Sequence, residues 1–170
     1  MIYDLLTLLD IIYCSIKDNV GRDVNEFVEI ACNQETNLSG YQIILVNGSS
    51  GKSYETFNLR ETCSPNSNFV VWDVSSSIQN GREDGIALVQ PDGTIVEFIS
   101  YEGSVTFRGR RSVDIKVSET NSTPRGESLQ KIGTGCEGSD FSWRRGTVRS
   151  SKGTINVGQT IDCRSGRDEL

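Results

Sequence analysis

The sequence predicts a single all-β domain, either a sandwich or a barrel. Short apolar or alternating segments recur roughly every ten residues, with turn residues between them, which is typical of these folds. The chain of 170 residues contains 17 glycines but only 3 prolines and 1 methionine. That composition suits many short strands joined by tight turns. A chain of this length forms one domain and buries a sizeable core without cross-links.

The expected strands are segments rich in β-branched and aromatic residues. They are 26–30, 41–46, 54–59, 69–72, 86–89, 94–101, 128–132 and 140–143. Asn47-Gly48 and Asp92-Gly93 predict hairpins, because such pairs provide the positive φ angles that tight turns require. Residues 102–127 are polar and are expected to form a loop.

The chain divides into three parts. Residues 1–12 form an apolar extension whose Leu and Ile side chains fall on one face at helical spacing, so that a short helix or a further strand is expected. Residues 13–163 form the β-domain. Residues 164–170 carry no apolar side chain before the last residue and are expected to form a flexible tail.

Composition excludes several classes of function. The chain contains no histidine, which excludes Ser-His-Asp and Cys-His catalysis and zinc sites that use histidine. Its net charge is -6, and an acidic chain repels the phosphate backbone, which argues against nucleic acid as a partner. No segment approaches the ~18 apolar residues that a transmembrane helix needs.

The five cysteines are Cys14, Cys32, Cys63, Cys136 and Cys163, and no two of them form a C-x-x-C pair. In an oxidising compartment two disulfides would form, for example Cys32–Cys63 and Cys136–Cys163, although four cysteines allow three connectivities. The alternative is five reduced thiols that behave as small buried hydrophobes.

Several features favour the secretory pathway. Sequons for N-glycosylation occur at Asn37, Asn47 and Asn121. The C-terminal Arg-Asp-Glu-Leu, residues 167–170, resembles a retrieval signal of the endoplasmic reticulum. The apolar N-terminal stretch lacks the pattern of a signal peptide, because acidic residues interrupt it and no Lys or Arg precedes it.

The order of short motifs resembles that of lamin tail domains of the secreted, bacterial type. The motifs are, in chain order, FVEI at 27–30, LSGY at 38–41, DGIALV at 84–89, VEFISYEG at 96–103, SLQ at 128–130, FSW at 141–143 and GTINVGQ at 153–159. This resemblance implies an immunoglobulin-like β-sandwich. It implies no reaction, because such domains are thought to serve in attachment or interaction.

We therefore expect a non-catalytic module that binds a protein or a polyanion through loops or a sheet edge. The alternative is a structural domain that self-associates through an edge strand, with the N-terminal apolar stretch as a contact. A metal-dependent hydrolase, or an accessory domain of one, is the third hypothesis. No cofactor is expected, apart from calcium at the acidic group described next.

An acidic group near the first strand is the candidate metal site. Asp18, Asp23, Glu26 and Glu29 lie close together in the sequence, and clustered carboxylate oxygens are the ligands that calcium prefers. Asp18, Asp23 and Glu26 are the expected metal ligands. The spacing does not match an EF-hand loop. The alternative is a solvated strand edge.

A basic cluster is the candidate ligand site. Arg108, Arg110 and Arg111 lie within four positions of one another, and arginines suit phosphate or acidic glycans. Further arginines follow at 144, 145 and 149. The alternative is a solvated loop whose charges balance nearby acids.

Overall fold

The computed structural model describes residues 9–14, 26–32, 36–60, 63, 69–74, 78–79, 81–120 and 122–162; for residues 9–14 only the strand itself is described. The elements are β1 (Leu9–Cys14), β2 (Phe27–Cys32), β3 (Gln42–Asn47), β4 (Lys52–Asn58), β5 (Phe69–Asp73), β6 (Gly85–Val89), β7 (Ile95–Ser100), β8 (Thr106–Phe107), β9 (Arg110–Arg111), β10 (Val113–Asp114), β11 (Glu127–Ser128), β12 (Lys131–Gly135), the 3-10 turn η1 (Gly138–Asp140), β13 (Phe141–Trp143), β14 (Val148–Arg149) and β15 (Gln159–Ile161). The predicted all-β sandwich is confirmed.

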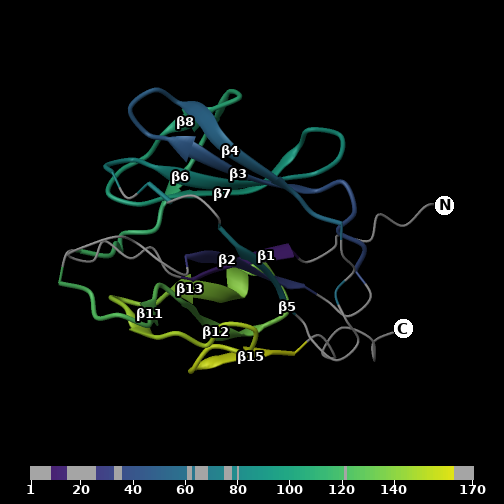
Figure 1. Cartoon of the computed structure of the whole chain (residues 1–170). Helices are drawn as coiled ribbons and strands as arrows, with labels where there is room; N and C mark the ends of the chain where they lie inside the picture. Colours follow the sequence, from purple (N-terminus) through teal and green to yellow (C-terminus); the bar gives the residue numbers. More distant parts are fainter. Residues whose placement is uncertain are drawn as a thin grey trace.

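Two sheets face each other. The larger has the order β10-β7-β6-β3-β4, and the smaller has the order β1-β2-β5. All neighbours in these sheets are antiparallel except the pair β10 and β7. Figure 1 shows the larger sheet above β1, β2 and β5, with the C-terminal strands β12, β13 and β15 beneath them.

The main core lies between the two sheets. The buried residues that meet there are Ile43 and Leu45 of β3, Ile86 and Leu88 of β6, Val28 and Ile30 of β2, and Val70 and Trp72 of β5. Every second residue of a strand points to the same face, which explains this set. Each fully buried Ile or Leu side chain contributes roughly 1.5–3 kcal/mol of transfer free energy.

A second core lies on the other face of the larger sheet. Ile44, Val46 and Phe98 are buried there against Phe107 of the hairpin formed by β8 and β9. The central strands β3 and β6 therefore bury both faces, which explains why IILV and IALV read as continuous apolar runs rather than as alternating ones.

The strand β2 is also buried on both faces. Its Val28 and Ile30 belong to the main core. On the other face, the backbone N–H of Gly153 donates to the carboxylate of Glu29, and the ammonium of Lys152 lies 4.8 Å from the ring centroid of Phe27. Segments from the C-terminal part of the chain thus cover the face of β2 that points away from the larger sheet.

The structure differs from the sequence predictions in two segments. Residues 102–127 contain the short strands β8, β9, β10 and the start of β11 in place of a continuous loop. Residues 9–14 form a strand paired with β2. Of the two alternatives expected for residues 1–12, the strand is therefore confirmed over residues 9–12, and the helix is wrong there. The predicted boundary between residues 12 and 13 falls inside this strand. Residues 1–8 and the predicted tail, 164–170, lie outside the described residues.

A disulfide joins Cys32 to Cys63. It links the end of β2 to the segment that follows β4, and both residues are buried. Cys136 is also disulfide-bonded. Its predicted partner Cys163 lies outside the described residues.

Candidate functional site

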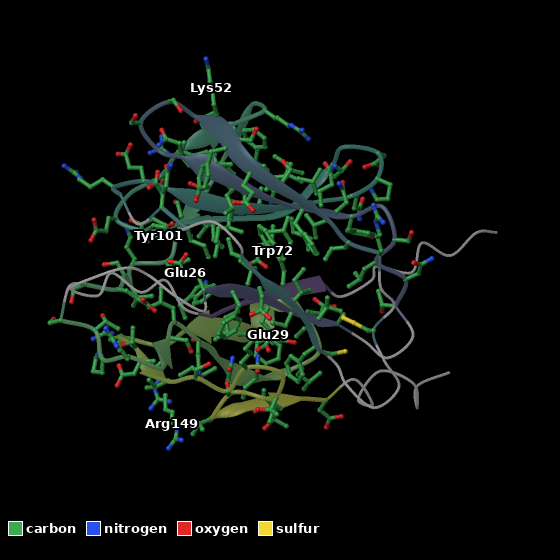
Figure 2. All side chains as sticks on the ribbon, in the orientation of Figure 1. Glu26, Glu29, Lys52, Trp72, Tyr101 and Arg149 are labelled. Atoms are coloured by element: carbon green, nitrogen blue, oxygen red, sulfur yellow. A yellow bond between two sulfur atoms is a disulfide. The ribbon has the colours of Figure 1, made fainter. Side chains whose placement is uncertain are left out.

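Two sheet edges meet on one side of the sandwich. The strand β4 is an edge of the larger sheet, and β5 is an edge of the smaller one. The rings of Phe57 on β4 and Trp72 on β5 stack, with centroids 4.8 Å apart and planes inclined by 9°. Because this stack joins the two layers, the edges of β4 and β5 lie beside each other; Figure 2 shows Trp72 between the layers.

A hollow of about 400 Å³ opens between these edges. Its lining residues are Thr56, Phe57, Asn58, Leu59, Arg60, Val70 and Val71. Both β4 and β5, with the residue that follows β4, contribute apolar side chains to the lining. The polar side chains of the lining come from β4 and from Arg60 just after it. Arg60 is exposed and forms no ion pair with any other described residue. The hollow therefore combines an apolar recess with one cation.

The segment that forms one wall of this hollow is held firmly. The N–H of Leu59 donates to the carbonyl of Tyr41 at 2.8 Å, and the N–H of Cys63 donates to the carbonyl of Thr36 at 2.9 Å. The disulfide from Cys63 to Cys32 connects the same segment to β2. The wall is thus fixed to both sheets, which favours binding without rearrangement.

The three predicted ligand-binding arginines lie in one hairpin but make different contacts. Arg108 lies in the turn between β8 and β9, with its guanidinium carbon 5.0 Å from the ring centroid of Phe107. Arg110 donates to the carbonyls of Ile95 and Val96 on β7. Arg111 is exposed on β9. Arg110 therefore holds the hairpin on the sheet, and Arg108 and Arg111 face solvent.

Only part of the predicted acidic group lies among the residues described, so the calcium site stays a prediction. Asp18 and Asp23 lie outside that part of the chain. Glu26 is buried, and its carboxylate accepts a hydrogen bond from the N–H of Ile78 at 2.7 Å. No cluster of three or more metal-ligating side chains occurs within the described ranges.

Glu29, which the sequence analysis places in the acidic group, is a buried carboxylate. It is fully buried in β2 (Figure 2), and its Oε1 has no hydrogen-bond partner within the described ranges. Burial raises its pKa from 4.5 to about 7, against the opposing effects of the Gly153 N–H and the Lys152 charge. The burial of Glu29 differs from the solvated edge that is the alternative interpretation of the sequence, and its position in the apolar run FVEIAC is the signal for that burial.

A second hollow, of about 570 Å³, lies on another part of the surface. It is lined by Ile115, Lys116, Val117, Ser118, Trp143, Arg145 and Gly146. The ammonium of Lys116 pairs with the carboxylate of Asp114 at 2.6 Å. Because Asp114 offsets the charge of Lys116, this hollow attracts an anion less strongly than its two basic lining residues would otherwise do.

Comparison with protein families, with curated proteins and with solved structures finds no match for this chain. The function is therefore argued from the surface itself, because one β-sandwich architecture hosts many unrelated functions. No helix in the described part of the chain is long and apolar enough to cross a membrane.

Proposed function

We propose that this domain is a non-catalytic interaction module that binds an extended peptide segment of a protein partner by strand addition to β4. The observation that carries the proposal is the hollow between the two neighbouring sheet edges. An edge strand presents backbone N–H and C=O groups that a peptide can pair with, and adjacent recesses select its side chains.

The surroundings of the hollow define the peptide. Phe57, Leu59 and Val71 favour an apolar side chain in the recess. Arg60 at its rim favours a carboxylate on a neighbouring residue of the peptide, because an exposed guanidinium forms bidentate contacts with carboxylates. The partner is therefore a segment that combines one apolar and one acidic residue in extended conformation.

We further propose that the domain is an immunoglobulin-like sandwich of the lamin-tail type. The order of motifs supports this assignment, and the two facing sheets are compatible with it. The proposed attachment function agrees with the role that the family resemblance implies, because neither requires a reaction.

The test is selection of peptides from a displayed random library on the purified domain, followed by titration of the selected peptides. We expect bound peptides to carry an apolar residue next to an acidic one. Arg60→Glu and Thr56→Lys should weaken binding at least tenfold, because the first reverses the rim charge and the second crowds the strand edge. Backbone amide signals of residues 52–60 should shift in NMR spectra.

Thr134→Lys is the matched control, since Thr134 is also an exposed threonine within a strand, but on β12. Equal binding by wild type, Thr56→Lys and Arg60→Glu would overturn the proposal. A mass in solution that doubles with concentration, and that Thr56→Lys abolishes, would instead assign the β4 edge to self-association.

A further inference from the structure

We propose that the surface formed by the β3–β4 turn and the β8–β9 hairpin binds a sulfated polysaccharide through Lys52, Arg108 and Arg111. This basic tip, as we call these three residues, is independent of the peptide site. The hollow lies at residues 56–60, near the end of β4, whereas Lys52 begins that strand.

The structure brings the three cations together from two separate turns. A Cβ atom on Gly51 would lie only 2.8 Å from the carbonyl oxygen of Thr106, so the two turns are in contact. Thr106 pairs with Arg111 across the hairpin, and Lys52 follows Gly51 directly. Figure 2 shows Lys52 pointing away from the rest of the molecule.

The segments that form the basic tip contain no acidic residue. Neither 42–54 nor 103–113 includes an Asp or a Glu. Lys52, Arg108 and Arg111 are exposed and have no ion pair with another described residue. In a chain of net charge -6, this concentration of one sign creates a local positive potential that attracts a polyanion.

Arg108 lies at the tip of the two-residue turn between β8 and β9. Arg108 has a φ of 50° and Gly109 a φ of 79°, which is the geometry of a two-residue turn that favours Asn-Gly. A residue with a long side chain in this region costs roughly 1–2 kcal/mol. Its guanidinium lies 5.0 Å from the ring centroid of Phe107 and the residue is exposed, so the positive charge lies at the tip of the hairpin.

The hairpin is held in place before any ligand arrives. The ring of Phe107 packs edge-on against Phe98 with centroids 6.2 Å apart, and Arg110 donates to carbonyls of β7. A preformed array of charges loses less conformational entropy on binding than a mobile loop does.

The disulfides favour a sulfated polysaccharide over other polyanions. Cys32 and Cys63 are bridged, and Cys136 is disulfide-bonded too. Such bonds persist in oxidising compartments outside the cytosol. Sulfated polysaccharides are the polyanions of that environment, and guanidinium groups bind sulfate oxygens as they bind phosphate oxygens.

The test is affinity chromatography on heparin, with salt-dependent titration of soluble heparin. We expect the wild-type chain to be retained at about 0.15 M salt, and Arg108→Ala/Arg111→Ala to lose at least tenfold in affinity. The slope of log affinity against log salt should fall by about two, because two charge contacts no longer release counterions.

The matched control is Arg145→Ala/Arg149→Ala, which changes the net charge equally. Figure 2 shows Arg149 at the opposite end of the molecule from Lys52. This control should bind heparin as the wild type does, and thermal melting should show both variants folded. Failure of the wild type to bind, or equal losses in the two double variants, would overturn the proposal. Tighter binding of RNA or of phosphatidylserine vesicles through the same arginines would also overturn it. None of these outcomes would affect the proposal for the peptide site on β4.

Discussion

The burial of Glu29 links the stability of the domain to pH. Its pKa is about 7 in the folded chain, compared with an ordinary value of 4.5. The folded state therefore holds the proton more tightly than the unfolded state does. The stabilisation is complete below pH 4.5 and is lost as the pH rises through about 7.

We predict that Glu29→Gln becomes stabilising as the pH rises. The difference in unfolding free energy between variant and wild type should grow by about 3 kcal/mol between pH 4.5 and pH 8, because a neutral amide cannot ionise in the apolar layer. Urea denaturation at a series of pH values measures this difference. Parallel stability curves for the two proteins would show that Glu29 has the same pKa in the folded and in the unfolded chain.

At Arg108 the turn geometry predicts an order of stabilities. Arg108→Asn should be more stable than Arg108→Ala by about 0.5–1 kcal/mol, because Asn tolerates positive φ and Ala does not. Both substitutions remove the contact with the Phe107 ring, so that their difference isolates the backbone effect. Thermal unfolding of the two variants measures this difference. If Arg108→Ala were as stable as Arg108→Asn, or more stable, the assigned turn would be contradicted.

The elements show what the sequence predicts and what it does not. The strands β3, β4, β6 and β7 lie within two residues of the predicted segments, because apolar runs flanked by Gly and Asn specify both strand and turn. The strands β8 and β9 are not predicted, because two residues are too few to show an alternating pattern. Their position depends on the packing of Phe107 against the outer face of the larger sheet.

The same reasoning applies to the site. The arginines of the β8–β9 hairpin were predicted as one cluster from their spacing, but the different contacts of Arg110 depend on where β7 lies. The peptide hollow could not be predicted, because Phe57 and Val70 come from strands of different sheets. The proximity of two sheet edges is a tertiary property that no local pattern contains.

The disulfide between β2 and the segment after β4 predicts a large change in stability. Its half-cystines are 31 residues apart, and closing a loop of that length in the unfolded chain is worth roughly 3.5 kcal/mol. Cys32→Ala/Cys63→Ala should lower the unfolding free energy by about this amount, as measured by urea denaturation. Peptide binding at the adjacent hollow should weaken as well. An unchanged urea midpoint would mean that packing alone fixes this wall.

At the scale of the whole molecule, one ion pair connects the C-terminal strands to the larger sheet. The ammonium of Lys131 on β12 lies 2.9 Å from the carboxylate of Glu97 on β7, and the lysine side chain is only 4% exposed. The same ammonium lies 5.8 Å from the ring centroid of Trp143. Removing the Glu97 carboxylate takes this partner from a lysine that stays buried, which is far more costly than removing both charges.

We therefore predict strong coupling between these two residues. Glu97→Gln alone should cost about 3 kcal/mol, because it removes this partner from the Lys131 ammonium, whose side chain is only 4% exposed. Adding Lys131→Met should restore a substantial part of that loss. A double-mutant cycle of urea unfolding measures the coupling, for which we expect roughly 1–3 kcal/mol. Additive effects would show that the C-terminal strands are held without this pair.

The contact between Gly153 and Glu29 joins residues separated by 124 positions. During synthesis β2 leaves the ribosome early, but the segment that covers its second face follows more than a hundred residues later. Until then one face of β2 stays exposed to water and to other nascent chains. Contacts of such long sequence separation slow folding and lengthen this interval. The domain therefore completes its structure only after almost the entire described chain has been made.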